Sequence, residues 1–130
     1  FQQGTYAPDA TYRWMGSAAM DKSGNMAVGY SASSSTINPS IRYAGRLASD
    51  AAGTLGTEVS LLQGSGSQTT GLSRWGDYST MQVDPSDDCT FWYSTEYEPA
   101  DGTWTLSVKD LVSGRTGTLD GWTLRIYGRQ

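Results

Sequence analysis

Apolar residues in this chain occur in short runs, and each run ends in a cluster of Gly, Ser, Asn, Asp or Pro. The clearest alternation lies in residues 103–108 and 121–127, where apolar and polar positions change at nearly every step. A period of two is typical of a strand with one buried face, and no segment shows helical periodicity. The side chains expected to face a core are Trp104, Leu106, Val108, Trp122, Leu124 and Ile126.

Two stretches repeat each other, residues 13–31 and residues 74–94. Each begins with Arg-Trp, and the second halves align without a gap as Asp-x-Ser-x-Asn/Asp-x-x-x-x-Tyr-Ser. In each copy an apolar run leads into a polar turn and a second apolar run leaves it, which is the pattern of a β-hairpin. The expected pairings are 14–20 with 26–30, and 78–83 with 89–93.

The remaining segments are more ambiguous. Residues 41–46 and 57–62 are predicted as strands, and residues 31–39 as a loop of low complexity. The Gly-Ser run at 64–67 predicts a flexible surface loop, and residues 1–12 predict an edge strand or an arm.

We expect one all-β domain, residues 1–130, folded as a jelly-roll-like β-sandwich. Joining the two hairpins to the terminal strands would let their apolar faces turn inward together. The alternative is a set of partial β-propeller blades followed by a β-hairpin, because repeated hairpins are typical of propellers. Two repeats cannot close a propeller, and open strand edges would lead to self-association.

Composition narrows the possible partners. The net charge is −4, with nine Lys and Arg scattered along the chain, so a nucleic-acid partner is not expected. No apolar run approaches the roughly 18 residues of a membrane span. The chain begins at Phe1 without Met, which suggests a processed or excised product. Cys89 is the single cysteine, and we expect a small buried apolar residue there rather than a reactive thiol.

Catalysis by a nucleophile and a histidine is excluded, because the chain contains no histidine. Paired carboxylates could support glycoside hydrolysis, which is the least favoured function. The crowded acids are Asp77, Asp84, Asp87, Asp88, Glu96 and Glu98. Several of them lie in a predicted turn, where aspartate serves local hydrogen bonding.

A calcium site is the second hypothesis for these acids. Asp84, Asp87 and Asp88 could supply hard oxygen ligands, with Asp21 and Asn25 as the equivalent set in the first repeat. The spacing does not match an EF-hand, and local hydrogen bonding remains the alternative.

Aromatic residues beside arginines suggest a glycan-binding module, because aromatic faces stack on sugar rings and polar groups bind their hydroxyls. In the alternative, Trp14 and Trp75 are core residues, each covered by its neighbouring arginine through a cation–π contact. The candidate ligand-binding residues are Tyr12, Arg13, Trp14, Arg74, Trp75 and Tyr78.

The C-terminal part resembles a known family. Residues 101–106, then Val108 and Asp110, then 116–119 and 122–124 resemble the end of the P domain, which accompanies proprotein convertases and many secreted bacterial proteases. The resemblance implies a jelly-roll β-sandwich over 101–127 that is not catalytic, that stabilises or regulates its neighbour or helps to hold substrates, and that is exported.

Residues 6–97 are similar to a propeller-like repeat region of large secreted bacterial proteins. Together these patterns predict a secreted, non-catalytic structural, adhesive or accessory module. Its expected partners are other domains of a secreted protein or further copies of itself, with glycan binding as the alternative.

Overall fold

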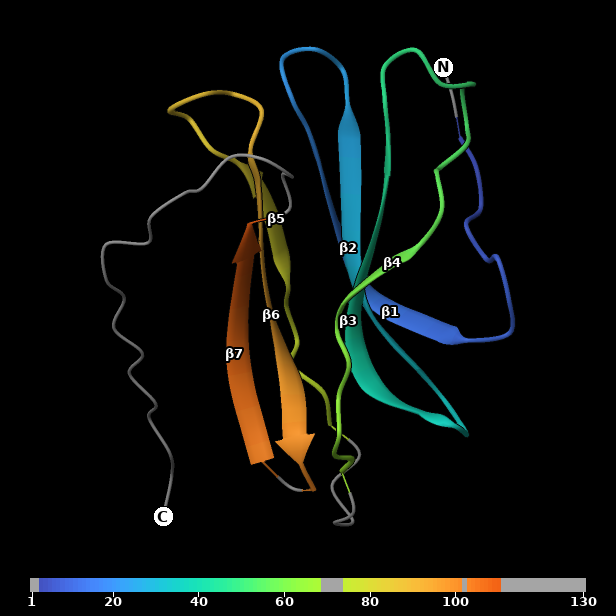
Figure 1. Ribbon diagram of the computed structural model, residues 1–130, viewed down its shortest axis with the longest axis vertical. Helices are drawn as coiled ribbons and strands as arrows, with labels where there is room; N and C mark the ends of the chain where they lie inside the picture. Colours follow the sequence, from blue (N-terminus) through green and yellow to red (C-terminus); the bar gives the residue numbers. More distant parts are fainter. Residues whose placement is uncertain (1–2, 69–73, 102, 111–130) are drawn as a thin grey trace.

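Two antiparallel sheets face each other in the computed structural model, which describes residues 3–68, 74–101 and 103–110, the last range by its backbone alone (Figure 1). One sheet contains β1 (Tyr12–Met20), β2 (Met26–Ser34), β3 (Ile37–Arg46) and β4 (Val59–Leu62); the other contains β5 (Thr80–Val83), β6 (Phe91–Ala100) and β7 (Thr103–Asp110). In both sheets, strands that are consecutive in sequence pair with each other. The predicted all-β sandwich is confirmed.

The internal repeat supplies one hairpin to each sheet. The first copy forms the β1–β2 hairpin and the second copy forms the β5–β6 hairpin. Each turn contains an equivalent hydrogen bond. Asp21 Oδ1 accepts the N–H of Ser23, and Asp84 Oδ1 accepts the N–H of Ser86, each at 2.8 Å. Both predicted hairpins are confirmed. The turns have this Asp–Ser hydrogen bond in common, but Asp21 also accepts the N–H of Asn25, whereas Asp84 also accepts the indole N–H of Trp92.

The two hairpins contact each other along β1 and β5. The N–H of Met81 donates to Ser17 Oγ at 2.9 Å, and Ser79 Oγ donates to the carbonyl of Met15 at 2.6 Å. At the turn end, Lys22 Nζ donates to a carbonyl of the second turn at 3.0 Å. The copies therefore lie face to face, as layers of a sandwich, rather than side by side as propeller blades.

The core lies between the sheets and centres on Tyr93, which is 1% exposed. Its ring packs on Gly29 of β2, where an added Cβ would lie only 2.8 Å from three ring atoms. The other buried members of this cluster are Ala27, Ile41, Met81 and Phe91. The absence of a side chain at position 29 lets the two sheets approach at this point.

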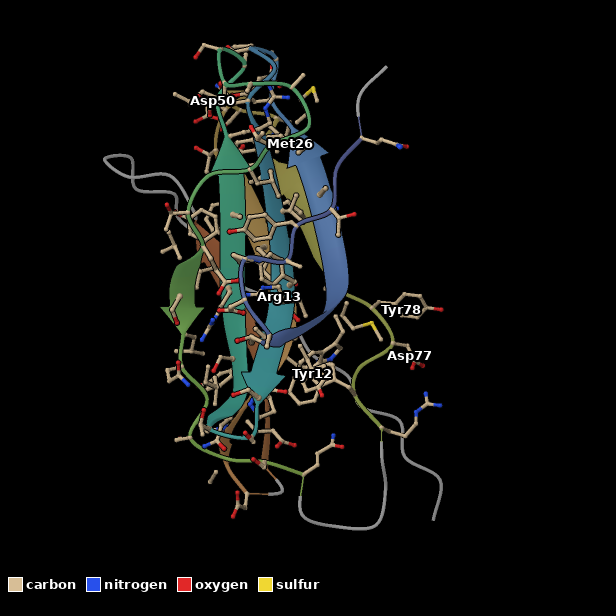
Figure 2. All side chains as sticks on the ribbon, turned by 90° about the vertical axis from the view of Figure 1, so that its right-hand side faces the viewer. Tyr12, Arg13, Met26, Asp50, Asp77 and Tyr78 are labelled. Atoms are coloured by element: carbon tan, nitrogen blue, oxygen red, sulfur yellow. The ribbon has the colours of Figure 1, made fainter. Side chains whose placement is uncertain are left out.

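The outer face of the β1–β4 sheet is covered by chain segments rather than by a third sheet. The arm that precedes β1 crosses this face in Figure 2. The hydroxyl of Tyr6 donates to the carbonyl of Gly56 at 3.0 Å, and its ring lies 6.4 Å from that of Tyr30. Residues 3–10 form no strand, so of the two expectations for the N-terminus the arm is the one observed.

The predicted loop at 31–39 is wrong. β2 continues to Ser34 and β3 begins at Ile37, so that a tight turn joins them. Ser31 and Ala32 are fully buried and remain in register with β3. A run of small polar residues has low strand propensity, but the neighbouring strand and the facing sheet override that preference.

The Gly-Ser run at 64–67 is not a flexible surface loop. Gly64 and Gly66 are buried, and an added Cβ on Gly64 would lie 1.9 Å from the carbonyl oxygen of Pro39. An added Cβ on Gly66 would lie 2.1 Å from the backbone of Ala100. These glycines permit close backbone contact rather than mobility.

The predicted strand at 103–108 is confirmed as β7, which pairs with β6, whereas the predicted strand at 121–127 lies outside the described residues. The predicted strands at 41–46 and 57–62 correspond to β3 and β4. In the part of the chain that the structure describes, no helix long and apolar enough to cross a membrane is found.

We expect Gly29→Ala to destabilise the protein by about 1–3 kcal/mol, because its methyl group would overlap the Tyr93 ring in a closely packed core. Chemical denaturation measures the change. Gly16→Ala is the matched control, since the nearest atom to its Cβ would be 4.0 Å away. Equal stability of the two variants would contradict the proposed role of Gly29.

Candidate functional site

Trp14 and Trp75 occupy equivalent positions of the repeat and meet in the structure. Their ring centroids lie 5.5 Å apart at an interplanar angle of 79°, an edge-to-face contact. Trp14 belongs to β1, and Trp75 to the segment that leads into β5. Both rings are partly buried, so the pair joins the two sheets at the end opposite the aspartate turns.

A hollow of about 370 Å³ lies at this tryptophan pair. Six of its ten lining residues carry a hydroxyl or amide side chain: Ser33, Ser34, Ser35, Asn38, Ser67 and Gln68. The others are the two tryptophans, Ile37 and Pro39. Larger hollows of about 580 and 520 Å³ lie elsewhere, and none of the predicted ligand-binding residues lines them.

The polar wall of this hollow is held in place by hydrogen bonds. Ser67 Oγ donates to Asn38 Oδ1 at 3.0 Å, and its N–H donates to Asp101 Oδ1 at 2.8 Å. Within the described residues, the side chains of Ser33, Ser35 and Gln68 make no hydrogen bond to the protein. Part of the wall is therefore fixed, and part retains hydrogen-bonding capacity.

Glu96 positions the second tryptophan through the backbone. The N–H of Gly76, the residue after Trp75, donates to the carboxylate of Glu96. Burial raises the pKa of Glu96, and the hydrogen bond from Gly76 acts in the opposite direction. A side chain at position 76 would lie against this carboxylate and would require the Glu96 side chain to move.

Arg13 lies on the other face of the sheet, although it precedes Trp14 directly (Figure 2). Its Nε donates to Glu58 Oε2 at 2.6 Å, and it also pairs with Asp9 at 2.9 Å. Glu58 accepts two further hydrogen bonds, from Tyr30 at 2.7 Å and Arg42 at 2.5 Å. Burial opposes the ionisation of Glu58, but these three donors keep its pKa below the ordinary value.

The remaining predicted ligand-binding residues do not line the hollow. Arg74 pairs with Asp77 on the surface at 2.7 Å. Tyr12 and Tyr78 are 73% and 91% exposed, and Tyr78 projects away from the sheets in Figure 2. Of the six residues predicted from the sequence, Trp14 and Trp75 are therefore the two that line this hollow.

The serine and amide residues of the hollow were missed by sequence reasoning. Ser33 to Ser35 fall in the run that was predicted as a low-complexity loop, and Gln68 follows the Gly-Ser segment. The repeated Arg-Trp pair was a usable signal for the tryptophans. No comparable signal marks the polar residues, because the folding of β2, β3 and the 64–67 segment brings them together.

The aspartates of the second turn bind protein groups. Asp84 Oδ2 accepts Trp92 Nε1 at 3.0 Å, while Asp87 accepts the hydroxyl of Thr90 at 2.7 Å and the N–H of Cys89 at 2.9 Å. These hydrogen bonds lower the pKa values of Asp84 and Asp87. Asp88 is exposed, and its φ of 55° lies in the left-handed region that Asp tolerates in turns.

Among the residues that the structure describes, no three His, Cys, Asp or Glu side chains gather closely enough to hold a metal ion. The turn aspartates make local hydrogen bonds, as the alternative to a calcium site predicted, and calcium binding stays a prediction. Cys89, expected to be buried, is partly exposed beside the turn.

Glu98 is an unusual acidic residue of β6. Its side chain is 1% exposed, and neither carboxyl oxygen has a hydrogen-bond partner among the described residues. Burial raises its pKa, and the nearby carboxylates of Asp101 and Glu96 raise it further. Among the described residues, no acidic side chain lines the hollow beside the tryptophans.

A comparison with family models matches the chain to the proprotein convertase P-domain over residues 56–126, more than half of the chain. The chain belongs to this family. The P domain is a β-sandwich and an accessory domain, in agreement with the two sheets found here. The resemblance expected at 101–127 is confirmed, and the match extends it toward the N-terminus as far as residue 56.

Searches of curated proteins and of solved structures found no match. The P-domain match begins just before β4, so β1, β2 and β3 lie outside it. The hollow takes Ser67, Gln68 and Trp75 from the matched part and its other residues from β1, β2, β3 and the turn between β2 and β3. The similarity of residues 6–97 to propeller-like repeats stays a prediction.

We expect Glu98→Gln to raise the free energy of unfolding at pH 7, on the order of 1 kcal/mol, because it removes an acid that is buried without a partner. Because the pKa of Glu98 is raised in the folded state, the stability linked to its protonation is fully present below the ordinary pKa of 4.5. That stability is lost as pH rises through the folded-state pKa. The difference between the variant and the natural chain should therefore shrink toward pH 4. Denaturant titrations across this pH range measure it.

Glu58→Gln is the matched control, and we expect it to change the free energy of unfolding in the opposite direction. The lowered pKa of Glu58 means that its stabilisation is present above pH 4.5 and is lost as pH falls. The Glu58→Gln substitution should lower the free energy of unfolding by about 2–4 kcal/mol at pH 7, because Arg13 and Arg42 would lose their partly buried counter-charge. Destabilisation by both variants at pH 7 would contradict the burial argument for Glu98.

Proposed function

We propose that this P domain is a non-catalytic accessory module of an extracellular protein, in which it packs beside a catalytic domain. The observation that carries the proposal is the family match over residues 56–126 in a chain that folds as two facing sheets. The family takes its name from proprotein convertases, whose catalytic machinery lies in another domain. Extracellular export is part of the proposal and follows from the same relationship.

The chemistry of the described residues supports a non-catalytic role. The chain has no histidine, so the usual base for a serine or cysteine nucleophile is missing. A carboxylate pair for glycoside hydrolysis would have to face a cleft across a gap of about 5–10 Å. Glu98 is buried and Asp84 and Asp87 bind turn groups, so these acids favour structural roles.

The strand edges favour an independent accessory unit over a self-assembling one. The edge of β1 faces β5, where Ser17 and Met15 receive hydrogen bonds from the second hairpin. β4 and β5 are only four residues long, which offers little template for another strand. β7, the eight-residue edge of the second sheet, is the exception. Three of the four described edges therefore support a monomer and weigh against the structural or adhesive polymer that the sequence left open.

We expect the purified chain to be a monomer near 14.0 kDa over a wide concentration range, because three of the four described edge strands, β1, β4 and β5, are short or covered. Size-exclusion chromatography with light scattering measures the mass. A mass that rises steadily with concentration would overturn the accessory proposal in favour of self-assembly.

The accessory role is tested in the full-length polypeptide that carries this chain. Removal of the chain is expected to lower the melting temperature or the secreted yield of the neighbouring catalytic domain. The isolated chain is expected to hydrolyse neither peptide nor glycoside substrates. A polypeptide without any catalytic domain, or turnover by the isolated chain, would contradict the proposal.

A further inference from the structure

We propose that the hollow beside Trp14 and Trp75, which we call the tryptophan hollow, binds one neutral sugar ring, either free or at the end of a short glycan. This proposal goes beyond the accessory role and stands on the geometry of the hollow alone. The tryptophan hollow combines partly exposed indole surface with side chains that bind hydroxyl groups.

The two indoles supply the surface on which a sugar can pack. An aromatic face is electron-rich, and the C–H groups on one face of a pyranose carry a small positive charge, so the two attract each other. The ring planes are nearly perpendicular, at 79°, and both tryptophans line the hollow. Glu96, through Gly76, and the strand pairing of β1 hold the two residues in place.

The polar lining matches the other face of a sugar, which carries hydroxyl groups. Serine hydroxyls both donate and accept, and the Gln68 amide offers two donors and one acceptor. Ser33, Ser35 and Gln68 make no hydrogen bond within the described residues, so they can bond a ligand without first breaking contacts in the protein. Such preorganisation lowers the free-energy cost of binding.

The charge of the tryptophan hollow selects for a neutral ligand. None of the described residues that line it is ionisable, and both arginines predicted to bind a ligand are paired elsewhere, Arg13 with Glu58 and Arg74 with Asp77. A phosphate or carboxylate would lose water here without gaining a counter-charge. Phosphorylated and acidic sugars are therefore disfavoured.

The size of the tryptophan hollow favours a compact ring over an extended peptide. At about 370 Å³ it lies near the lower end of ligand-binding pockets, which run from about 300 to 1,000 Å³. A proline-rich segment also binds aromatic residues, but it needs a groove that follows several residues of extended chain. A proline-rich peptide is therefore a comparison ligand in the test.

The test is calorimetric titration of the whole chain with neutral tetrasaccharides of glucose, xylose, mannose and galactose. An oligogalacturonate and a proline-rich peptide supply the acidic and peptide comparisons. We expect saturable binding of at least one neutral sugar, with a Kd on the order of 1 mM. Ser35→Ala and Gln68→Ala should each weaken it about 3–10-fold, because each removes one hydrogen-bonding side chain.

Tyr78→Ala is the matched control, because this exposed aromatic residue does not line the tryptophan hollow and its loss should leave the affinity unchanged. Trp75→Phe should weaken binding further, and circular dichroism checks that each variant remains folded. The proposal is overturned if no neutral sugar binds at about 10 mM, if the Ser35 and Gln68 variants bind equally well, or if only the acidic or peptide ligand binds. None of these outcomes affects the oligomeric mass or the role beside a catalytic domain, so the two proposals fail separately.

Discussion

The contact between Tyr93 and Gly29 determines how the two sheets meet. A large ring from β6 fills the space that a missing side chain leaves on β2, and this pairing sets the approach of the two sheets. With that distance fixed, the first and second copies of the repeat lie face to face. The aspartate turns then approach each other at one end, and the two tryptophans meet at the other.

The acids of the chain show how unevenly charge is accommodated around this core. Glu58 lies beneath the N-terminal arm with three hydrogen-bond donors, so its burial is compensated. Glu98 is buried with no donor from the described residues, and folding therefore favours its protonated form. The aspartates of the turns stay ionised by bonding nearby N–H and O–H groups. Acidic side chains thus have three different physical roles in one small sandwich.

The tryptophan hollow crosses the boundary of the family match. Its residues from β1, β2 and β3 precede residue 56, whereas Ser67, Gln68 and Trp75 follow it. The P-domain relationship therefore accounts for the sandwich and for the proposed accessory role, but only partly for this hollow. Its properties depend on how this particular chain packs its N-terminal hairpin against the matched part.

The sequence by itself determined the hairpins, the turn chemistry and the P-domain relationship, because turn residues and period-two alternation act locally. It could not determine which face each strand buries. Tyr30 and Tyr93 are equivalent in the repeat, yet Tyr30 bonds Glu58 on the outer face while Tyr93 fills the core. A shift of one residue reverses every side chain of a strand, and packing between distant segments selects the register. The same packing also places Arg13 and Trp14 on opposite faces of the sheet and brings Ser35 and Gln68 close to the tryptophans.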